Sequence, residues 1–293
     1  FVKEVLDEVA YVFPSHLIHV GGDEVPPTRW NECEKCRAAM KAANVDAVGL
    51  EHVFMEQVFE HLATLHRRPM VWDEALPEKP GKNPPVVVAW QSKERGDLAV
   101  KRGFDTVYAP YQTNYFNFHQ SGRDDIEPGS DGLVSVDMVL SGELPSGAHV
   151  LGGEGALWTE YAVTQDDLDL LAMPRAAALA DVLWFGKSFD FGYRFSSPEH
   201  LALLDRAGIR YFIAPPTEPE GHRLRRRRVV VDEASLRLEP PALLAPAGSV
   251  RYTRDGSTPT ASSPRYRDPL QITGETTIRT AFVLANGRSS AII

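Results

Sequence analysis

Short and almost wholly apolar segments alternate along this chain with longer amphipathic ones, and this alternation limits the fold more than any other feature. Residues 86–90 are three valines, an alanine and a tryptophan, with no polar residue to face water. Strands buried on both faces, each followed by a helix, are typical of a parallel sheet covered by helices. Further strands of this kind are expected at 17–22, 69–74, 104–110 and from 149. The sequence therefore predicts an α/β fold over residues 1–213.

The amphipathic segments predict helices at 1–9, 28–41 (with Thr28 as N-cap), 48–66, 92–102 and 167–185. A long polar loop is expected after residue 110. We count about five strand–helix units, whereas a (β/α)8 barrel has eight. The pattern thus predicts the later part of a TIM barrel, with about three units missing upstream. The chain begins without Met and inside a helix, which favours a fragment or a processed form.

The character of the sequence changes after residue 213. Prolines 215, 216 and 219 with Gly221 indicate a linker over 214–228, and the basic run within it is interpreted as solvated surface. Short β-type runs separated by turn residues follow at 229–293. They predict a small antiparallel β-sandwich, whose role is either to bind carbohydrate or to support the barrel.

Charge and cysteine content exclude several classes of function. The 293 residues carry a net charge of −9, which gives no general case for nucleic-acid binding. No apolar run approaches the ~20 residues that a membrane-spanning helix needs. The two cysteines, Cys33 and Cys36, are a weak metal signal and are compatible with a local disulfide, a redox pair or two free thiols. We favour a structural or incidental role for them.

Two adjacent carboxylates, Asp23 and Glu24, follow the strand expected at 17–22 and its two glycines. In parallel α/β folds ligands bind at the carboxyl ends of the strands, where these acids would lie. The alternative is a strand, a turn and two solvated acids. Trp72, Trp90 and Trp158 also lie at expected strand ends, and aromatic rings there suit the apolar face of a sugar. Core packing is the alternative for any one of them.

Several motifs follow one another in an order that we know from one family. They are His19-Val20-Gly21-Gly22-Asp23-Glu24, Val71-Trp72-Asp73-Glu74, Val88-Ala89-Trp90, Tyr115-Phe116-Asn117, Gly153 to Glu160, Pro174-Arg175, and Tyr252 to Thr260. The chain resembles the bacterial β-N-acetylhexosaminidases of glycoside hydrolase family 20, followed by the β-sandwich module often found with them. The resemblance covers most of the chain.

The resemblance implies a retaining exo-acting enzyme that removes terminal GlcNAc or GalNAc from oligosaccharides or glycans and needs no cofactor or metal. The nucleophile is the substrate's own 2-acetamido group, which forms an oxazolinium ion. By resemblance, Glu24 is the general acid and base, and Asp23 holds the acetamido N–H. The residues expected to bind the sugar are His19, Trp72, Trp90, Tyr115, Asn117, Trp158 and Glu160.

Two departures bear on this reading. The family often has Asp two residues after the tyrosine, and here Asn117 stands there, so recognition of the 4- and 6-hydroxyls is weakened. The family's sugar-binding arginine lies on an earlier strand than any in this chain. Without upstream strands we expect little activity, which leaves a carbohydrate-binding or structural fragment as the alternative. A metallohydrolase that uses His19, Asp23 and Glu24 is a third hypothesis, which the sequence disfavours because it has no set of further histidine ligands. A periplasmic or secreted location is suspected by resemblance only.

Overall fold

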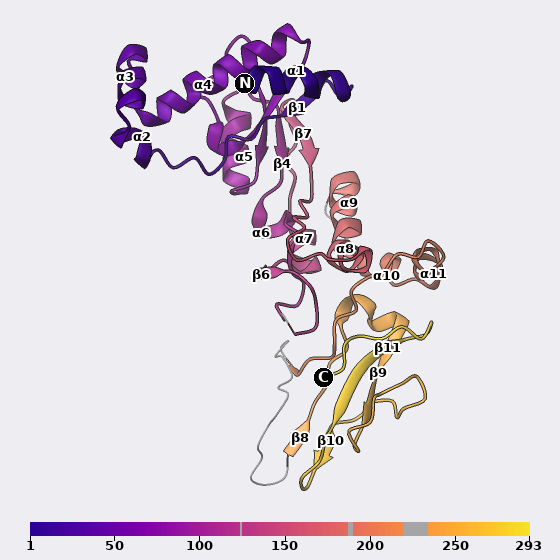
Figure 1. The fold of residues 1–293 in the computed structure, drawn as a ribbon. Coiled ribbons are helices and arrows are strands. Elements are labelled where there is room, and N and C mark those ends of the chain that lie inside the picture. The colour runs from indigo at the N-terminus through magenta and orange to yellow at the C-terminus, as the bar shows by residue number, and fades with distance from the viewer. Residues whose placement is uncertain (124, 187–189, 220–233) are drawn as a thin grey trace. The chain divides into compact units, whose positions relative to one another are not determined.

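The computed structural model describes residues 1–123, 125–186, 190–219 and 234–293 (Figure 1). The chain divides into two compact units, which we describe one at a time. The first unit comprises Phe1–Tyr115 and Gly142–Ala156, and the second comprises Phe116–Ser141 and Leu157–Ile293. Most of the expected linker, including its basic run, lies outside the described residues, and the domain boundaries at 213 and 229 stay predictions.

A five-stranded, wholly parallel sheet forms the centre of the first unit. Its order is β1-β2-β3-β4-β7, so strands that follow one another in the chain are neighbours up to β4. The strands are β1 (Leu17–His19), β2 (Arg68–Trp72), β3 (Val86–Ala89), β4 (Thr106–Tyr108) and β7 (Val150–Gly153). All four residues of β3 are buried, as its apolar composition predicts. The parallel α/β arrangement is therefore confirmed.

Helices cover this sheet. Helix α4 packs on β2, α5 packs on β3 and β4, and α1 packs on α4 (Figure 1). The buried contacts come from apolar residues of α4 and α5 against valines of the strands, with Phe59 and Val87 among them. The helices of the unit are α1 (Val2–Val12), α2 (Thr28–Glu32), α3 (Glu34–Ala43), α4 (Ala47–Thr64), α5 (Lys93–Lys101) and α6 (Tyr111–Asn114), with a 3-10 turn, η1, at Asp73–Ala75.

The helix expected at 28–41 is wrong as a single element. It is two helices, α2 and α3, with Cys33 between them in an extended conformation at φ −78° and ψ 121°. The Cys33 thiol accepts the backbone N–H of Cys36 and so caps α3. Thr28 is the first helical residue and not the N-cap, a position that Pro27 occupies without a side-chain hydrogen bond.

The helix expected at 167–185 is also two helices, α8 (Gln165–Ala172) and α9 (Arg175–Phe185), in the second unit. Pro174 separates them because it has no N–H to donate within a helix. Thr164 and Asp167 form a reciprocal capping box at the start of α8.

The polar loop expected after residue 110 is more structured than predicted. Besides α6 it holds β5 (Phe118–His119), β6 (Ser130–Leu133) and α7 (Val136–Leu140). Strands β5 and β6 pair with each other, with Phe118 opposite Ser130. A two-residue strand has no periodicity to detect in a sequence, so this element was not predicted.

The rest of the second unit combines helices with antiparallel strand pairs. Strand β9 pairs with β11, and β8 pairs with β10. Residues of α9, α10, α11, β9 and β11 share one apolar core, which contains Leu179, Phe195 and Phe282. The elements are α10 (Phe191–Phe195), α11 (Pro198–Arg206), β8 (Ala234–Leu236), η3 (Ala242–Ala247), β9 (Gly248–Thr253), β10 (Leu270–Ile272) and β11 (Arg279–Leu284).

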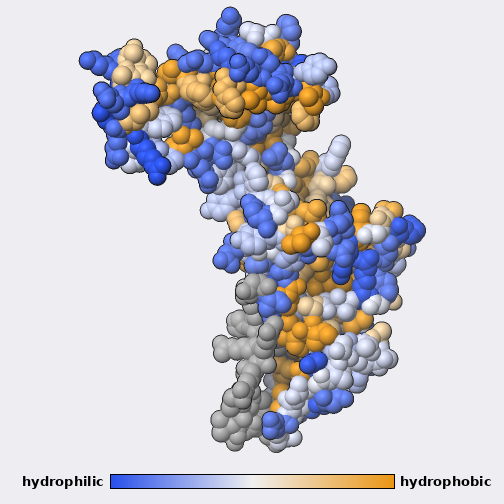
Figure 2. All heavy atoms as spheres, in the orientation of Figure 1, coloured by the Kyte–Doolittle hydropathy of each residue, from blue (hydrophilic) through white to orange (hydrophobic). Residues whose placement is uncertain are grey.

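Apolar side chains are exposed in both units, as the orange patches of Figure 2 show. Phe1 and Tyr11 are each 91% exposed in the first unit, and Trp184 is 83% exposed in the second. Within the described ranges, no helix has the length and apolar character needed to cross a membrane.

Candidate active site

The chain leaves β1 through a turn that only glycine accommodates. The N–H of Val20 bonds to the carbonyl of Met70, and the N–H of Trp72 bonds to the carbonyl of Gly21, so pairing with β2 extends past β1. Gly21 and Gly22 then have φ of 76° and 91°. A Cβ on Gly22 would lie 2.6 Å from the Cβ of Ala75. The turn therefore needs glycine for its φ and, at Gly22, for its space as well.

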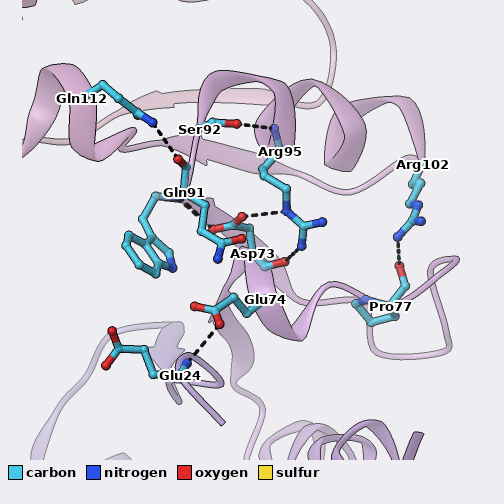
Figure 3. Close-up of polar contacts among 10 residues, drawn as sticks. Glu24, Asp73, Glu74, Pro77, Gln91, Ser92, Arg95, Arg102 and Gln112 are labelled. Carbon is cyan, nitrogen blue, oxygen red and sulfur yellow. Dashed lines mark hydrogen bonds and ion pairs between the residues drawn. The ribbon is translucent and has the colours of Figure 1, made fainter. Parts of the chain in front are cut away.

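This turn presents Asp23 and Glu24 at the carboxyl end of β1. Asp23 is half-buried and Glu24 is exposed. Glu24 has a φ of 52°, a conformation that costs free energy in a residue other than glycine. Its backbone N–H donates to Oε2 of Glu74 at 3.2 Å, and its own carboxylate points away from Glu74 (Figure 3). Glu74 thus anchors the backbone of Glu24, whose side chain is exposed.

The carboxyl group of Glu74 is only partly hydrogen-bonded. Its second oxygen, Oε1, is buried and has no hydrogen-bond partner in the described part of the chain. It also raises the pKa of Glu51, although burial is the larger cause of that shift. A buried carboxylate oxygen without a hydrogen-bond partner costs free energy. Other contacts of the chain therefore keep Glu74 at this position, among them the bond from the Glu24 N–H.

Asp73, the residue before Glu74, is fully buried and joins the ends of β2 and β3. Its Oδ1 accepts the backbone N–H groups of Trp90 at 3.0 Å and Gln91 at 3.4 Å. Its Oδ2 accepts Nε of Arg95 at 2.9 Å, and the same guanidinium donates to the Asp73 carbonyl (Figure 3). Asp73 therefore fixes the backbone from which the Trp90 ring projects. Sequence reasoning identified Asp73 and Glu74 only as acids that end a strand and gave them no role.

Aromatic rings gather after β3 and β4. Trp90 stacks on Tyr115, with ring centroids 6.1 Å apart and an interplanar angle of 23°. Tyr111 lies against both, 6.2 Å from Trp90 and 6.4 Å from Tyr115. The Nε1–H of Trp90 is buried and has no acceptor among the residues described. Two of the predicted aromatic residues, Trp90 and Tyr115, are therefore in contact, and sequence reasoning did not assign Tyr111 to this cluster.

His19 contacts Trp72, the third of the predicted aromatic residues that lie in the first unit, with ring centroids 4.6 Å apart. Its Nδ1 accepts the backbone N–H of Gly21 at 3.2 Å, so the neutral ring carries its proton on Nε2. Burial lowers the pKa of His19, and the nearby Asp23 opposes that shift. The residue as a whole is exposed, but its ring packs on Trp72 and is neutral above the lowered pKa, which suits a supporting role.

The remaining predicted residues, Asn117, Trp158 and Glu160, belong to the second unit. Asn117 is buried and donates from Nδ2 to the hydroxyl of Ser130 at 3.1 Å. Its Oδ1 has no hydrogen-bond partner within the described ranges. Trp158 is 43% exposed, and Glu160 is exposed as well.

The backbone on both sides of Asn117 is fixed by Arg175, which is fully buried at the start of α9. Its guanidinium donates to four backbone carbonyls, those of Phe116, Phe118, Val134 and Leu171. Burial lowers the pKa of Arg175 to about 9. The sequence contained the Pro174-Arg175 motif, but only the structure assigns Arg175 this positioning role.

Glu154 is an acid at the end of β7 that sequence reasoning did not single out. Its backbone N–H bonds to the carbonyl of Tyr108 at 3.0 Å, and its own carbonyl accepts Nδ2 of Asn114 at 2.7 Å. The residue as a whole is exposed, and partial desolvation of its carboxyl group raises the pKa of that group. Strands β1, β2 and β7 of the first unit thus all end in carboxylates. Across the described residues, no group of three or more His, Cys, Asp or Glu side chains is arranged to hold a metal ion.

A parallel sheet with acids and aromatic rings at its carboxyl edge is the arrangement of a (β/α)-barrel hydrolase. The family model for the glycosyl hydrolase family 20 catalytic domain matches residues 1–187, and the model for the chitobiase/beta-hexosaminidase C-terminal domain matches residues 236–293. The chain belongs to glycosyl hydrolase family 20. Both the predicted family and the predicted C-terminal module are confirmed.

Individual relatives agree with this assignment. The chain is 32% identical over 308 residues to a beta-hexosaminidase of Porphyromonas gingivalis, a match that covers all of this chain and 38% of the relative. A beta-hexosaminidase of Vibrio furnissii is 32% identical over 191 residues, which are 61% of this chain and 31% of that protein. This chain therefore spans about a third of the length of these relatives.

Solved structures show the same fold. A GH20 exo beta-N-acetylglucosaminidase from Vibrio harveyi, in complex with N-acetylglucosamine, has a TM-score of 0.62 and 28% identity. The match covers 72% of this chain and 35% of that one. A beta-N-acetylhexosaminidase from Bacteroides fragilis has a TM-score of 0.61 and 26% identity over 73% of this chain and 46% of the other. The five parallel strands are thus part of a TIM barrel, as predicted.

Proposed function

We propose that the protein of which this chain is part is a retaining exo-β-N-acetylhexosaminidase. The observation that carries the proposal is the Asp23–Glu24 pair at the end of β1 in a member of family 20, with the Glu24 backbone held by Glu74 and its carboxyl group exposed. An exposed carboxyl group beside a fixed backbone is available for proton transfer to a bound substrate.

In this proposal the substrate supplies its own nucleophile. The acetamido oxygen attacks the anomeric carbon while Glu24 gives its proton to the leaving-group oxygen, and an oxazolinium ion forms. Asp23 accepts the acetamido N–H and stabilises the positive charge that develops there. Water then attacks the anomeric carbon, Glu24 takes its proton, and the configuration is retained.

The aromatic residues provide the walls for the sugar. By family resemblance, Trp72 and Trp90 of the first unit and Trp158 of the second contact the pyranose ring and the acetamido methyl group, and Tyr115 donates a hydrogen bond to the acetamido carbonyl. The stacking of Tyr115 on Trp90 supports this role, because it limits the ring to one orientation. His19 supports Trp72 from the side of β1.

The other contacts concern the hydroxyl groups. By family resemblance Glu160 binds the 4- and 6-hydroxyls, and Asn117 adds a neutral contact through its Oδ1, which has no hydrogen-bond partner among the described residues. Terminal GlcNAc or GalNAc of chitooligosaccharides or glycans is the proposed substrate. By family resemblance we place the protein in the periplasm or outside the cell.

The test uses the full-length protein and a chromogenic N-acetyl-β-glucosaminide. Glu24→Gln keeps the shape but removes the proton donor, so kcat should fall by about 10²–10⁴-fold. Glu32→Gln, at an exposed site on the following helix α2, is the matched control and should leave kcat unchanged. Unchanged turnover in Glu24→Gln would falsify the proposed role of Glu24.

A further inference from the structure

The two cysteines lie where α2 ends and α3 begins, a part of the chain to which the proposed reaction gives no role. They are the only cysteines in the 293 residues. Cys33 is the N-cap of α3, and Cys36 lies in the first turn of that helix. The Sγ of Cys33 accepts the backbone N–H of Cys36 at 3.5 Å. Both are free thiols and partly exposed, so a solution reagent can reach them.

The surroundings make the two thiols unequal. The side chain of Cys36 lowers the pKa of Cys33, and the backbone N–H groups of Cys36 and Lys35 and the guanidinium of Arg37 lower it further. The same contact raises the pKa of Cys36. A thiolate at a helix N-terminus is also favoured by the helix dipole. Cys33 is therefore the better nucleophile, and Cys36 keeps its proton until a later step.

The helical backbone is interrupted at Cys33, between α2 and α3. The N–H of Cys33 bonds back to the carbonyl of Arg29, and the carbonyl of Cys33 accepts the N–H of Arg37. The Arg37 side chain donates to the carbonyl of Asn31 at 3.0 Å and so links α3 to α2. The first thiol thus lies at the N-cap, outside the helical turn that holds the second.

We propose that Cys33 and Cys36 form a thiol–disulfide exchange pair, with Cys33 as the attacking and Cys36 as the resolving residue. The oxidant is a low-molecular-weight disulfide, RSSR. The Cys33 thiolate attacks one sulfur of RSSR, the S–S bond breaks, and one RS⁻ leaves. Cys36 then loses its proton to solvent and attacks Sγ of Cys33, and the second RS⁻ leaves. The protein loses two protons and two electrons, and RSSR gains them to become two RSH.

The test equilibrates the full-length protein in buffers of oxidised and reduced glutathione, quenches with acid and alkylates with N-ethylmaleimide. Intact mass then counts the alkylated thiols of the whole protein, and mass spectrometry of the digest assigns those at Cys33 and Cys36. We expect Cys33 and Cys36 to carry two labels or none, with a loss of two hydrogens in the unlabelled form. The equilibrium constant for oxidation should differ from that of the same protein in urea by about tenfold, because the fold fixes the backbone at Cys33 and the charges around its thiol.

Single variants separate the two roles. Cys36→Ser should accumulate a mixed disulfide between Cys33 and glutathione, because no resolving thiol remains. Cys33→Ser should leave Cys36 alkylated slowly and with little adduct. The proposal is overturned if both thiols stay free in oxidised glutathione, if the equilibrium matches that in urea, or if Cys36 is the residue that carries the adduct. Disulfide-linked dimers in place of the internal bridge would overturn it too.

Discussion

Two Asp–Glu dipeptides end the neighbouring strands β1 and β2, and their surroundings are opposite. Asp73 is fully buried, with both oxygens bonded to backbone N–H groups and to Arg95. Asp23 is half-buried, and Glu24 is exposed. Glu74 connects the two pairs, because it accepts the backbone N–H of Glu24.

The difference arises from what precedes each pair. Trp72 leads directly from β2 into Asp73, so that acid stays at the sheet edge and is enclosed. After β1, by contrast, the turn at Gly21-Gly22 stands between the strand and the acids, so Asp23 and Glu24 lie beyond the edge of the sheet. A carboxylate whose oxygens already bind the fold has little capacity to exchange protons with a substrate, whereas an unbonded one has that capacity. The same dipeptide is therefore a structural link at one strand end and a candidate catalytic group at the next.

The largest effect on stability is expected at Asp73. Asp73→Asn puts an amide against two N–H groups and a guanidinium, and should lower the free energy of unfolding by about 2–4 kcal/mol. Urea unfolding of the full-length protein measures it. Asp46→Asn is the matched control, since Asp46 caps α4 by accepting the N–H of Gly49 and asparagine caps equally well. Equal stability of the two variants would show that Asp73 is not the link we describe.

A smaller effect is expected at Glu74, and it tests the connection between the two pairs. Glu74→Ala removes the acceptor for the Glu24 N–H and should lower kcat/KM about tenfold through kcat, because the proton donor is less well positioned. Glu74→Gln keeps an oxygen acceptor and should recover most of the loss. Glu78→Ala, at an exposed site nearby, should behave as wild type. A change confined to KM would contradict a positioning role.

The smallest effect concerns pH and the residue beside Trp72. Because burial lowers the pKa of His19 below 6.5, the unfolded chain binds more protons than the folded one just below that pH. The free energy of unfolding should therefore fall as the pH drops through 6.5 toward the folded pKa. His19→Gln should flatten this part of the profile, and NMR titration of the ring should give a midpoint below 6.5. A midpoint above 6.5 would refute the account of the His19 environment.

Sequence reasoning predicted the parallel sheet because its strands are apolar on both faces, and residues 86–89 are the plainest case. It identified Asp23 and Glu24 because glycines and a strand precede them. It missed the helix break at Cys33, where no residue type signals one, and the break at Pro174, where the proline was passed over in favour of the apolar spacing of 167–185. It gave no role to Asp73, Glu74 or Arg175, because each acts through partners distant in sequence. Such long-range hydrogen bonds produce no periodic pattern in the sequence.

The contact between Gly22 and Ala75 has a consequence for engineering. A Cβ at position 22 would lie 2.6 Å from that of Ala75, so the turn after β1 and the one after β2 fit together as a pair. A loop exchanged after one strand alone would meet an unmatched partner after the other. Designs that alter specificity at this edge of the barrel therefore have to replace both turns together.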